Sequence, residues 1–350
     1  MPITTTCIGA WPKPAYVHLP DWFNTPDGPD SADPTGARER AWAALGDDAE
    51  AVIARGVREA VEDQVAAGID IPTDGEITRE NYIHYHCRHL AGVDFSELTE
   101  KSLRGGAYRA RLPTITGAIG VAGLFLARDF LRARQFTDRP VKITMPGPMT
   151  IADTTADAYY HDPVRLGADL ADALNAEVLS LAEAGCRHIQ VDEPLFARKP
   201  REALSHGFEH LERVFEGCPE HVTRTVHMCC GYPDRLDNPD YPKADRHAYL
   251  ELAEAVEASS IDAVSLEDAH RRNGPELFRK FRSTTVIVGV VAVAKSRVES
   301  ESEIAARLSE LLGVIDAERL VAAPDCGLGL LGRELARAKL VNMCRAAVSV

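Results

Sequence analysis

The sequence lacks any apolar run of the roughly 18 residues that a membrane-spanning helix needs. Its first residues, MPITTTCIGAWPKP, have neither the charged start nor the apolar stretch of a signal peptide. We therefore expect no association with membranes and a cytoplasmic location.

Positive charge is also scarce. Lys and Arg together number 39 against 53 Asp and Glu, which gives a formal net charge of −14. An acidic surplus disfavours nonspecific binding to phosphate backbones or anionic lipids, so we expect no nucleic-acid partner.

Cysteine is too dilute for a disulfide scaffold, with 8 in 350 residues. Thiols in a reducing compartment are more often buried, metal-bound or catalytic. The chain also has no Gly-rich phosphate loop after any predicted strand, which argues against an open nucleotide-binding sheet.

What is present is a globular composition, with 45% hydrophobic and 26% charged residues. Short β-rich runs alternate with longer amphipathic stretches, which favours a parallel sheet. The predicted strands are Thr4–Ala10, Ile69–Asp74, Arg111–Thr116, Val141–Met145, His188–Asp192, Val222–Cys229, Ala263–Glu267, Val286–Val291 and Leu320–Pro324. The predicted helices are Ala37–Ala67, Pro163–Ala184, Tyr249–Ala258, Ser300–Leu312 and Leu331–Ala347.

This pattern predicts an α/β fold, a single TIM (β/α)8 barrel over residues 1–350. Nine strands are one more than a barrel requires, so we expect residues of about 81–136 to form an insertion that carries the extra one. The Pro-, Asp- and Gly-rich segment Leu19–Gly36 predicts a long N-terminal loop.

Polar and reactive residues recur at the C-terminal ends of the predicted strands. In a barrel these ends converge on one face, where residues far apart in the sequence meet in one site. The residues are Glu76, Asp192, Glu193, His227, Cys229, Glu267 and Cys326.

Four of these residues predict a metal site. His227 and Cys229 are two residues apart in one strand and so share a face, while Glu267 and Cys326 end two further strands. Two thiolates, an imidazole and a carboxylate form a tetrahedral set for Zn²⁺. A buried cysteine alone is more often a small apolar residue, so the prediction depends on their joint placement. Ligands from three strands indicate a catalytic zinc, which can hold a substrate thiol as a thiolate.

Seven segments, in order, resemble the cobalamin-independent methionine synthase family, specifically its zinc-bearing C-terminal barrel. They are TTTCIGAWPKP, TDGEITREN, MPGPMTIAD, IQVDEPLF, VHMCC, VSLED and APDCGL, and the resemblance spans nearly the whole chain. It implies a methyltransferase of methionine biosynthesis in which zinc, held by His227, Cys229, Glu267 and Cys326, activates homocysteine.

The resemblance also implies how homocysteine is bound. Glu76 and Asp192 would be catalytic residues that hold its ammonium group, and the backbone of Ile8, Gly9 and Ala10 would meet its carboxylate. A buried ammonium needs a paired charge, which fits the two acids.

The sequence departs from the family around the methyl donor. Full-length family members carry an additional N-terminal barrel that helps hold the polyglutamyl folate. We expect none in this chain, which resembles the short, single-domain subgroup of the family. A pterin-stacking Trp is replaced by Thr154 or Thr155, a proton-donating His by Ala294 or Lys295, and a Ser by Ala10. These changes favour a donor other than polyglutamyl methyltetrahydrofolate, such as methylcobalamin or a corrinoid protein that would be a partner.

Two alternatives remain open. Another zinc thiolate alkyltransferase, similar to the enzymes that add coenzyme M to epoxides, would need a cationic clamp, for which the candidates are Arg79, Arg88, Arg109 and Arg111. A non-enzymatic zinc subunit is the third interpretation, although polar strand ends around an open metal position fit a small substrate better than a flat interface.

Overall fold

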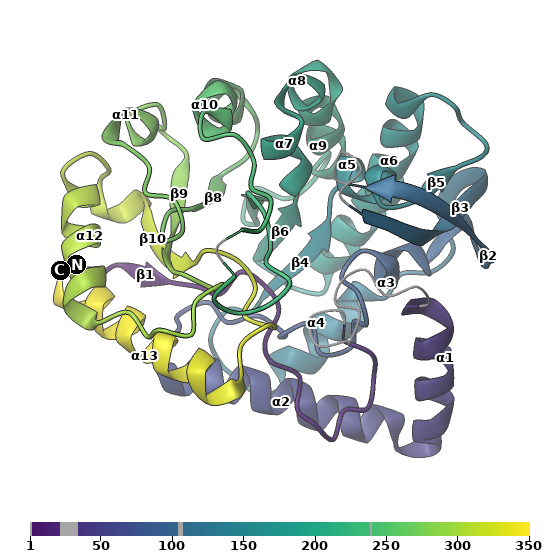
Figure 1. Cartoon of the computed structure of the whole chain (residues 1–350), viewed down its shortest axis with the longest axis horizontal. Coiled ribbons are helices and arrows are strands. Elements are labelled where there is room, and N and C mark those ends of the chain that lie inside the picture. The colour runs from purple at the N-terminus through teal and green to yellow at the C-terminus, as the bar shows by residue number, and fades with distance from the viewer. Residues whose placement is uncertain (1, 22–33, 104–107, 239) are drawn as a thin grey trace.

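The computed structural model describes the chain except for residues 1, 22–33, 104–107 and 239 (Figure 1). Its central sheet has seven parallel strands in the order β1-β10-β9-β8-β7-β6-β4. These strands are β1 (Thr4–Thr5), β4 (Lys142–Pro146), β6 (His188–Asp192), β7 (Thr223–Met228), β8 (Ala263–Glu267), β9 (Thr285–Val291) and β10 (Leu320–Pro324).

Residues 71–73 take the eighth position of the ring between β1 and β4. Ile71 pairs with Thr6, and Thr73 pairs with Lys142, both in parallel. The sheet therefore closes into a single TIM barrel, which confirms the predicted fold class.

Two predicted strands are shorter than expected. Of Thr4–Ala10, only β1 and a bridge at Thr6 pair regularly, and Ile69–Asp74 forms single bridges. Side chains take the place of ladder bonds here, because Asp70 accepts the Thr5 N–H at 2.9 Å and Gln64 accepts the Thr73 N–H at 2.9 Å.

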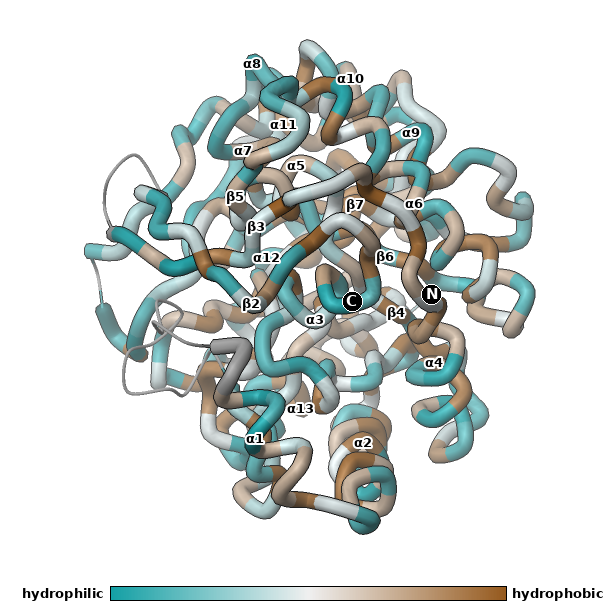
Figure 2. Tube along the Cα trace, turned by 90° about the vertical axis from the view of Figure 1, so that its right-hand side faces the viewer, coloured by the Kyte–Doolittle hydropathy of each residue, from teal (hydrophilic) through white to brown (hydrophobic). Residues whose placement is uncertain are grey.

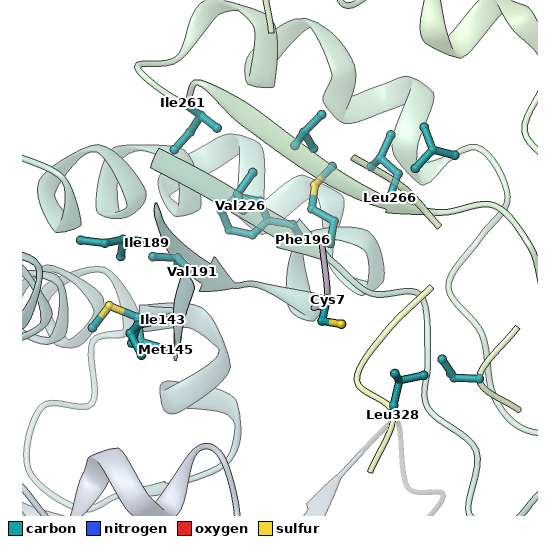
Figure 3. Close-up of a cluster of buried hydrophobic side chains, with 14 of the residues drawn as sticks. Cys7, Ile143, Met145, Ile189, Val191, Phe196, Val226, Ile261, Leu266 and Leu328 are labelled. Carbon is teal, nitrogen blue, oxygen red and sulfur yellow. The ribbon is translucent and has the colours of Figure 1, made fainter. Parts of the chain in front are cut away.

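Strands β4 and β8 are buried at every residue, because helices cover the outside of the barrel and side chains fill its inside. Figure 3 shows part of the resulting core, with Ile143 and Met145 beside Ile189 and Val191. The strands accordingly read as nearly continuous apolar runs.

Helices surround the barrel (Figure 1). The longer ones are α1 (Pro34–Leu45), α2 (Ala49–Ala67), α4 (Leu126–Arg134), α6 (Pro163–Glu183), α10 (Ala248–Ala258), α12 (Glu301–Leu312) and α13 (Arg333–Ser349). Shorter ones are η2 (Gly46–Asp48), α3 (His84–Cys87), α5 (Pro148–Asp153), α7 (Pro194–Arg198), α8 (Pro200–Glu202), η4 (Ala203–Gly207), α9 (Phe208–Val214), α11 (Pro275–Phe278) and η5 (Ala317–Arg319).

The predicted helix Ala37–Ala67 is two helices. Gly46, at φ +54°, interrupts it, and the single turn η2 joins α1 to α2. The predicted loop Leu19–Gly36 lies mostly outside the described residues, and α1 already begins at Pro34.

A long antiparallel hairpin is inserted into the barrel. Its strands β2 (Leu90–Leu103) and β3 (Tyr108–Val121) form a three-stranded sheet with β5 (Ala156–Asp157) beside the barrel (Figure 1). The predicted strand Arg111–Thr116 lies within β3.

The two ends of the chain lie side by side in both views (Figures 1 and 2), where the Ile3 N–H donates to the Ala347 carbonyl at 2.9 Å. Within the described ranges, none of the helices combines the length and apolar character that crossing a bilayer requires.

Candidate metal centre and substrate pocket

Three predicted ligands meet at one end of the barrel. The ligand atoms of His227, Cys229 and Cys326 all lie within 4.8 Å of one another, and the two sulfurs are 3.7 Å apart. That distance is far above the roughly 2.05 Å of a disulfide bond, and both thiols are free. His227 and Cys229 are buried, whereas Cys326 is partly exposed.

Glu267, the fourth predicted ligand, adjoins this cluster. Its Oε1 accepts from the Cys229 thiol at 3.0 Å and from the Cys230 N–H at 2.8 Å. Glu267 is 1% exposed, and its Oε2 is buried without a hydrogen-bond partner.

One ring nitrogen of His227 has a hydrogen-bond partner and the other has none. Its Nδ1 is 2.9 Å from the Ser265 hydroxyl, which faces it across the β7–β8 pairing, while its Nε2 is buried with no partner. A buried polar atom without a partner is costly. A metal ion bound to Nε2 would explain why this nitrogen has none.

The protonation states of the cluster fit a site for a cation. Burial lowers the pKa of His227 to about 3, so the imidazole is neutral. The hydrogen bond with Cys326, and then burial, raise the pKa of the Cys229 thiol, while burial and the nearby Cys229 raise that of Glu267. Without a cation, the thiol and the carboxyl group therefore hold their protons, and a divalent ion would displace them.

A second group of possible ligands, Glu267, His270 and Asp325, has a structural role. Asp325 accepts backbone N–H groups of residues 268–270 at 2.7–2.9 Å and lies 2.7 Å from His270 Nδ1. His270 Nε2 in turn accepts the Ala294 N–H at 3.0 Å. Both imidazole nitrogens are thus used, and Asp325 fixes the loop that follows Glu267.

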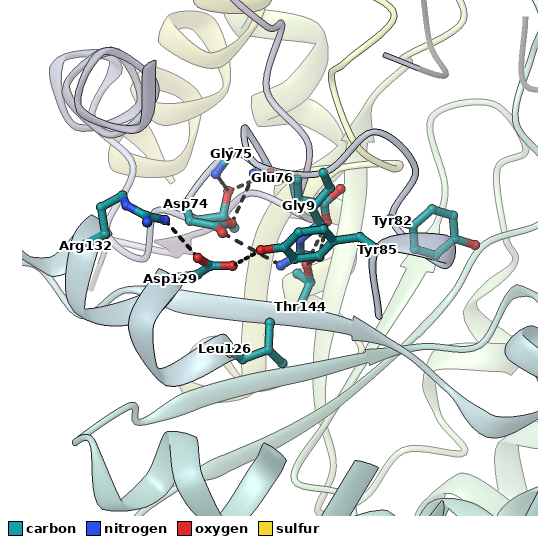
Figure 4. Close-up of polar contacts among 12 residues, drawn as sticks. Gly9, Asp74, Gly75, Glu76, Tyr82, Tyr85, Leu126, Asp129, Arg132 and Thr144 are labelled. Atoms are coloured by element: carbon teal, nitrogen blue, oxygen red, sulfur yellow. Dashed lines mark hydrogen bonds and ion pairs between the residues drawn. The ribbon is translucent and has the colours of Figure 1, made fainter. Parts of the chain in front are cut away.

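Glu76 lies against the backbone of Gly9. Its Oε1 accepts from Thr144 Oγ1 at 2.6 Å and from Arg79 Nη1 at 3.3 Å (Figure 4). A Cβ on Gly9 would lie 2.3 Å from the same oxygen, so only glycine permits this approach. The backbone of Glu76 has φ +55°, a value that residues other than glycine rarely adopt. Such strained residues often lie at functional sites.

Asp192 lies between Ile8 and the metal centre. Its Oδ1 accepts from Gln190 Nε2 at 2.7 Å, and the same nitrogen donates to the Ile8 carbonyl at 2.8 Å. Asp192 also pairs in register with His227 across β6 and β7. Burial, and then the charge of Glu76, raise the pKa of Asp192 to about 8.

The third backbone residue, Ala10, adjoins the Cys326 loop. Its carbonyl accepts the Leu328 N–H at 2.8 Å, and a Cβ on Gly327 would lie 3.1 Å from Ala10 Cβ. Residues 8–10 therefore run from the two acids to the metal centre.

Both carboxylate oxygens of Glu193, the neighbouring acid, are hydrogen-bonded to α5. Its carboxylate accepts the Met149 N–H at 2.9 Å and the Thr150 hydroxyl at 2.8 Å, both at the start of α5. Burial raises its pKa to about 8. Glu193 thus holds α5 in place.

Several residues of this site carried no sequence signal that we used. Ser265 precedes Glu267 by two positions in β8, and Gln190 precedes Asp192 by two in β6, so strand alternation could have placed both in the site. Thr144 and Arg79 are recognisable only from the fold.

At the positions where the resemblance led us to expect an aromatic residue and a histidine, the structure has short or exposed side chains. Thr154 and Thr155 turn their hydroxyls back onto α5, to the carbonyls of Thr150 and Ile151. Ala294 is buried, and Lys295 is exposed.

The four arginines considered as a cationic clamp do not form one. Arg79 is buried between Glu76 and Asp74, and Arg88 pairs with Glu80. Arg109 pairs with Glu100 on the hairpin, where Arg111 is also exposed.

Comparison with known proteins shows the family to which the chain belongs. The family model described as "Cobalamin-independent synthase, Catalytic domain" matches residues 3–213 and 241–349. The methionine synthase of Sulfolobus acidocaldarius is 28% identical over 99% of this chain and 92% of its own length, and that of Saccharolobus solfataricus is 29% identical over 97% and 92%.

Solved structures give the same result. A B12-independent methionine synthase from Shewanella sp. W3-18-1, in complex with selenomethionine, is 30% identical with a TM-score of 0.85 over 99% of this chain and 97% of that one. A protein from Listeria monocytogenes described as a B12-independent methionine synthase has 21% identity and a TM-score of 0.69 over 96% and 98%, and supports the fold. The chain thus belongs to the cobalamin-independent methionine synthase family and is a methyltransferase.

Proposed function

We propose that the protein is a zinc-dependent thiol methyltransferase that converts homocysteine to methionine with a methyl donor other than polyglutamyl methyltetrahydrofolate. The observation that carries this proposal is that the predicted substrate pocket and the metal centre adjoin each other on the neighbouring strands β6 and β7. Asp192, the residue for the amino-acid end of the substrate, is paired in register with His227, the residue for the metal.

The four proposed ligand residues fit zinc. His227, Cys229, Glu267 and Cys326 would hold it, since a buried imidazole nitrogen and a buried carboxylate oxygen lack partners beside two thiols. Zinc bound there supplies a Lewis acid that lowers the pKa of a substrate thiol. Ser265 would orient His227 from behind, as such partners of metal ligands do.

The amino-acid end of homocysteine fits the acid pair. Glu76 raises the pKa of Asp192, which indicates that the two carboxyl groups interact, and an ammonium between them would stabilise both in ionised form. The backbone of Ile8, Gly9 and Ala10 would face the substrate carboxylate. The selenomethionine in the Shewanella relative is the selenium analogue of the proposed product, which supports an amino-acid pocket.

The donor proposal depends on the side chains at the position where the family has a proton-donating histidine. A tertiary amine such as folate N5 leaves poorly unless it is protonated. His270 lies beside Ala294, but its nitrogens are bonded to Asp325 and to the Ala294 N–H. Lys295 is exposed. A corrinoid leaves without protonation, so methylcobalamin or a corrinoid protein is the favoured donor.

Thr154 and Thr155 support the same conclusion. Their side chains are small and bonded to α5, so they offer no aromatic surface for a pterin ring. An aromatic stacking contact contributes about 0.5–1.5 kcal/mol.

The test supplies homocysteine to the zinc-loaded protein with methylcobalamin, methyltetrahydrofolate or its triglutamate, and measures methionine. We expect turnover with methylcobalamin and a rate with either folate that is lower by about 10²–10⁴-fold, the usual contribution of general acid catalysis. Efficient turnover with a folate would overturn the donor proposal. Failure with all three donors, in a protein that binds homocysteine, would indicate a donor of another class.

A further inference from the structure

A lysine is buried inside the barrel next to a neutral partner. Lys142, on β4, is 2% exposed, and its Nζ donates to Gln190 Oε1 at 2.6 Å. In the described part of the chain, no carboxylate forms an ion pair with it. Burial lowers its pKa to about 8, so it remains mostly an ammonium ion at pH 7. Asp192 and Cys7 interact with it electrostatically, but the side chain to which it is hydrogen-bonded is a neutral amide, and burying a charge in this way is costly.

Gln190 connects this lysine to both halves of the substrate pocket. Gln190 is fully buried, and its Nε2 donates to Asp192 Oδ1 at 2.7 Å and to the Ile8 carbonyl at 2.8 Å. The two hydrogens of the amide nitrogen are therefore both used, and the amide oxygen accepts from Lys142.

Lys142 determines which way the amide faces. An ammonium group only donates, an amide oxygen only accepts and an amide nitrogen only donates. With Lys142 on one side, the oxygen of Gln190 must face the lysine and the nitrogen must face Asp192 and Ile8. With the opposite orientation, two acceptors would face the amide oxygen and two donors would face each other.

We propose that Lys142 and Gln190 are positioning residues that hold Asp192 in place for the ammonium group of an amino-acid thiol, with the Ile8 carbonyl as the second anchor of the Gln190 amide nitrogen. This inference rests on the proposed function and adds two residues that do not touch the substrate. Because Asp192 is held through Oδ1, its Oδ2 is the oxygen left for the substrate ammonium. Specificity for an amino acid over a simple thiol acid would therefore depend on the lysine.

The test compares two thiols that differ only in the amino group. L-homocysteine and 4-mercaptobutanoate are titrated into the zinc-loaded protein by calorimetry. We expect the unmodified protein to prefer homocysteine. In Lys142→Met, we expect the dissociation constant of homocysteine to rise by about tenfold or more, the equivalent of one lost charge-assisted hydrogen bond. That of 4-mercaptobutanoate should stay within about twofold, and the zinc content should not change.

A double variant guards against a folding defect. Lys142→Met with Gln190→Met removes the lysine and its amide partner together, so neither is left without the other, while Asp192 Oδ1 and the Ile8 carbonyl both lose their donor. It should lose the preference for homocysteine as well. Lys101→Met is the matched control, because Lys101 also donates to neutral oxygens, the carbonyls of Asp153 and Thr155, but lies on β2 of the inserted hairpin.

The outcomes separate the two proposals. An equal loss for both thiols, or none, would overturn the positioning role. An unmodified protein that binds the two thiols equally would contradict the amino-acid acceptor itself.

The intact protein gives an independent check by NMR. Both side-chain amide protons of Gln190 should exchange slowly with solvent and shift with homocysteine but not with 4-mercaptobutanoate. Fast exchange would contradict the proposal even if neither variant folds.

Discussion

At the scale of single residues, Cys326 offers the simplest test of the metal centre. It is the most exposed of the four proposed ligands, and it follows β10 rather than belonging to a strand. Cys326→Ser is expected to lose most of its zinc and its methyl transfer, because a serine hydroxyl is a poor ligand for Zn²⁺. The barrel should stay folded, since Cys326 is only partly buried against the main core and serine is similar in size to cysteine.

Elemental analysis and thermal unfolding would measure the two effects. Cys218→Ser is the matched control, because Cys218 is a free, partly exposed thiol away from the cluster. A Cys326→Ser protein that keeps one tightly bound zinc ion would exclude Cys326 as a ligand.

Asp192 tests the acceptor. Asp192→Asn keeps the size and the bond from Gln190 but removes the charge that would pair with a buried ammonium. We expect kcat/KM for homocysteine to fall by the equivalent of about 2 kcal/mol or more, with zinc retained. The exposed Asp47→Asn serves as the control. Unchanged kinetics would show that the thiol is not recognised through its ammonium group.

From the sequence, the positions of individual residues could be predicted only where strand geometry determines them. Alternation and strand ends brought His227, Cys229 and Asp192 to one face, and the structure has them together. Asp325 and His270 depend on how a loop folds back, which spacing does not show.

At the scale of secondary-structure elements, α12 shows how local sequence sets a boundary. Ser300 accepts the Glu303 N–H at 3.2 Å, and the Glu303 side chain accepts the Ser300 N–H at 2.9 Å, which is a capping box. Ser300→Ala is expected to lower the free energy of unfolding by about 1 kcal/mol. Urea unfolding would measure this, with the exposed Ser309→Ala as control; an unchanged value would deny the cap any stabilising role.

The contact between α4 and α6 should make stability depend on pH. Glu177, on α6, accepts the N–H groups of Phe125 and Leu126 at 3.0 and 3.1 Å, and burial raises its pKa to about 7. In the unfolded chain its pKa is about 4.3. The raised pKa means that its contribution to stability is full below about pH 4 and is lost as the pH rises to about 7.

The glutamine of Glu177→Gln stays neutral. As the pH rises from 5 to 8, the stability of this variant should therefore increase relative to that of the unmodified protein. We expect a relative gain of about 1 kcal/mol or more in the free energy of unfolding. Denaturant unfolding at both pH values would measure it, with the exposed Glu183→Gln as control. A constant difference between the proteins would show that Glu177 is ionised at pH 5.

Elements were predictable where one physical signal dominates. Buried strands such as β4, β6 and β8 read as apolar runs and were placed to within a residue or so. The segments 4–10 and 69–74 read in the same way, but Asp70 and Gln64 occupy their backbone groups. The break at Gly46 was missed because helical spacing continues across it.

At the scale of the whole molecule, the barrel explains how ligands almost 100 residues apart form one site. Cys229 and Cys326 follow strands β7 and β10, and β8 and β9 lie between these two strands in the sheet. The closed ring brings the C-terminal ends of these strands to one face, next to the segment 8–10 that follows β1. This convergence follows from the fold class alone.

The central claim is that a substrate thiol binds zinc held by His227, Cys229, Glu267 and Cys326. X-ray absorption at the zinc edge counts its sulfur neighbours directly. We predict two sulfur ligands near 2.3 Å in the zinc-loaded protein and three after homocysteine is added. Two sulfurs in both samples, with homocysteine shown to be bound, would contradict the account.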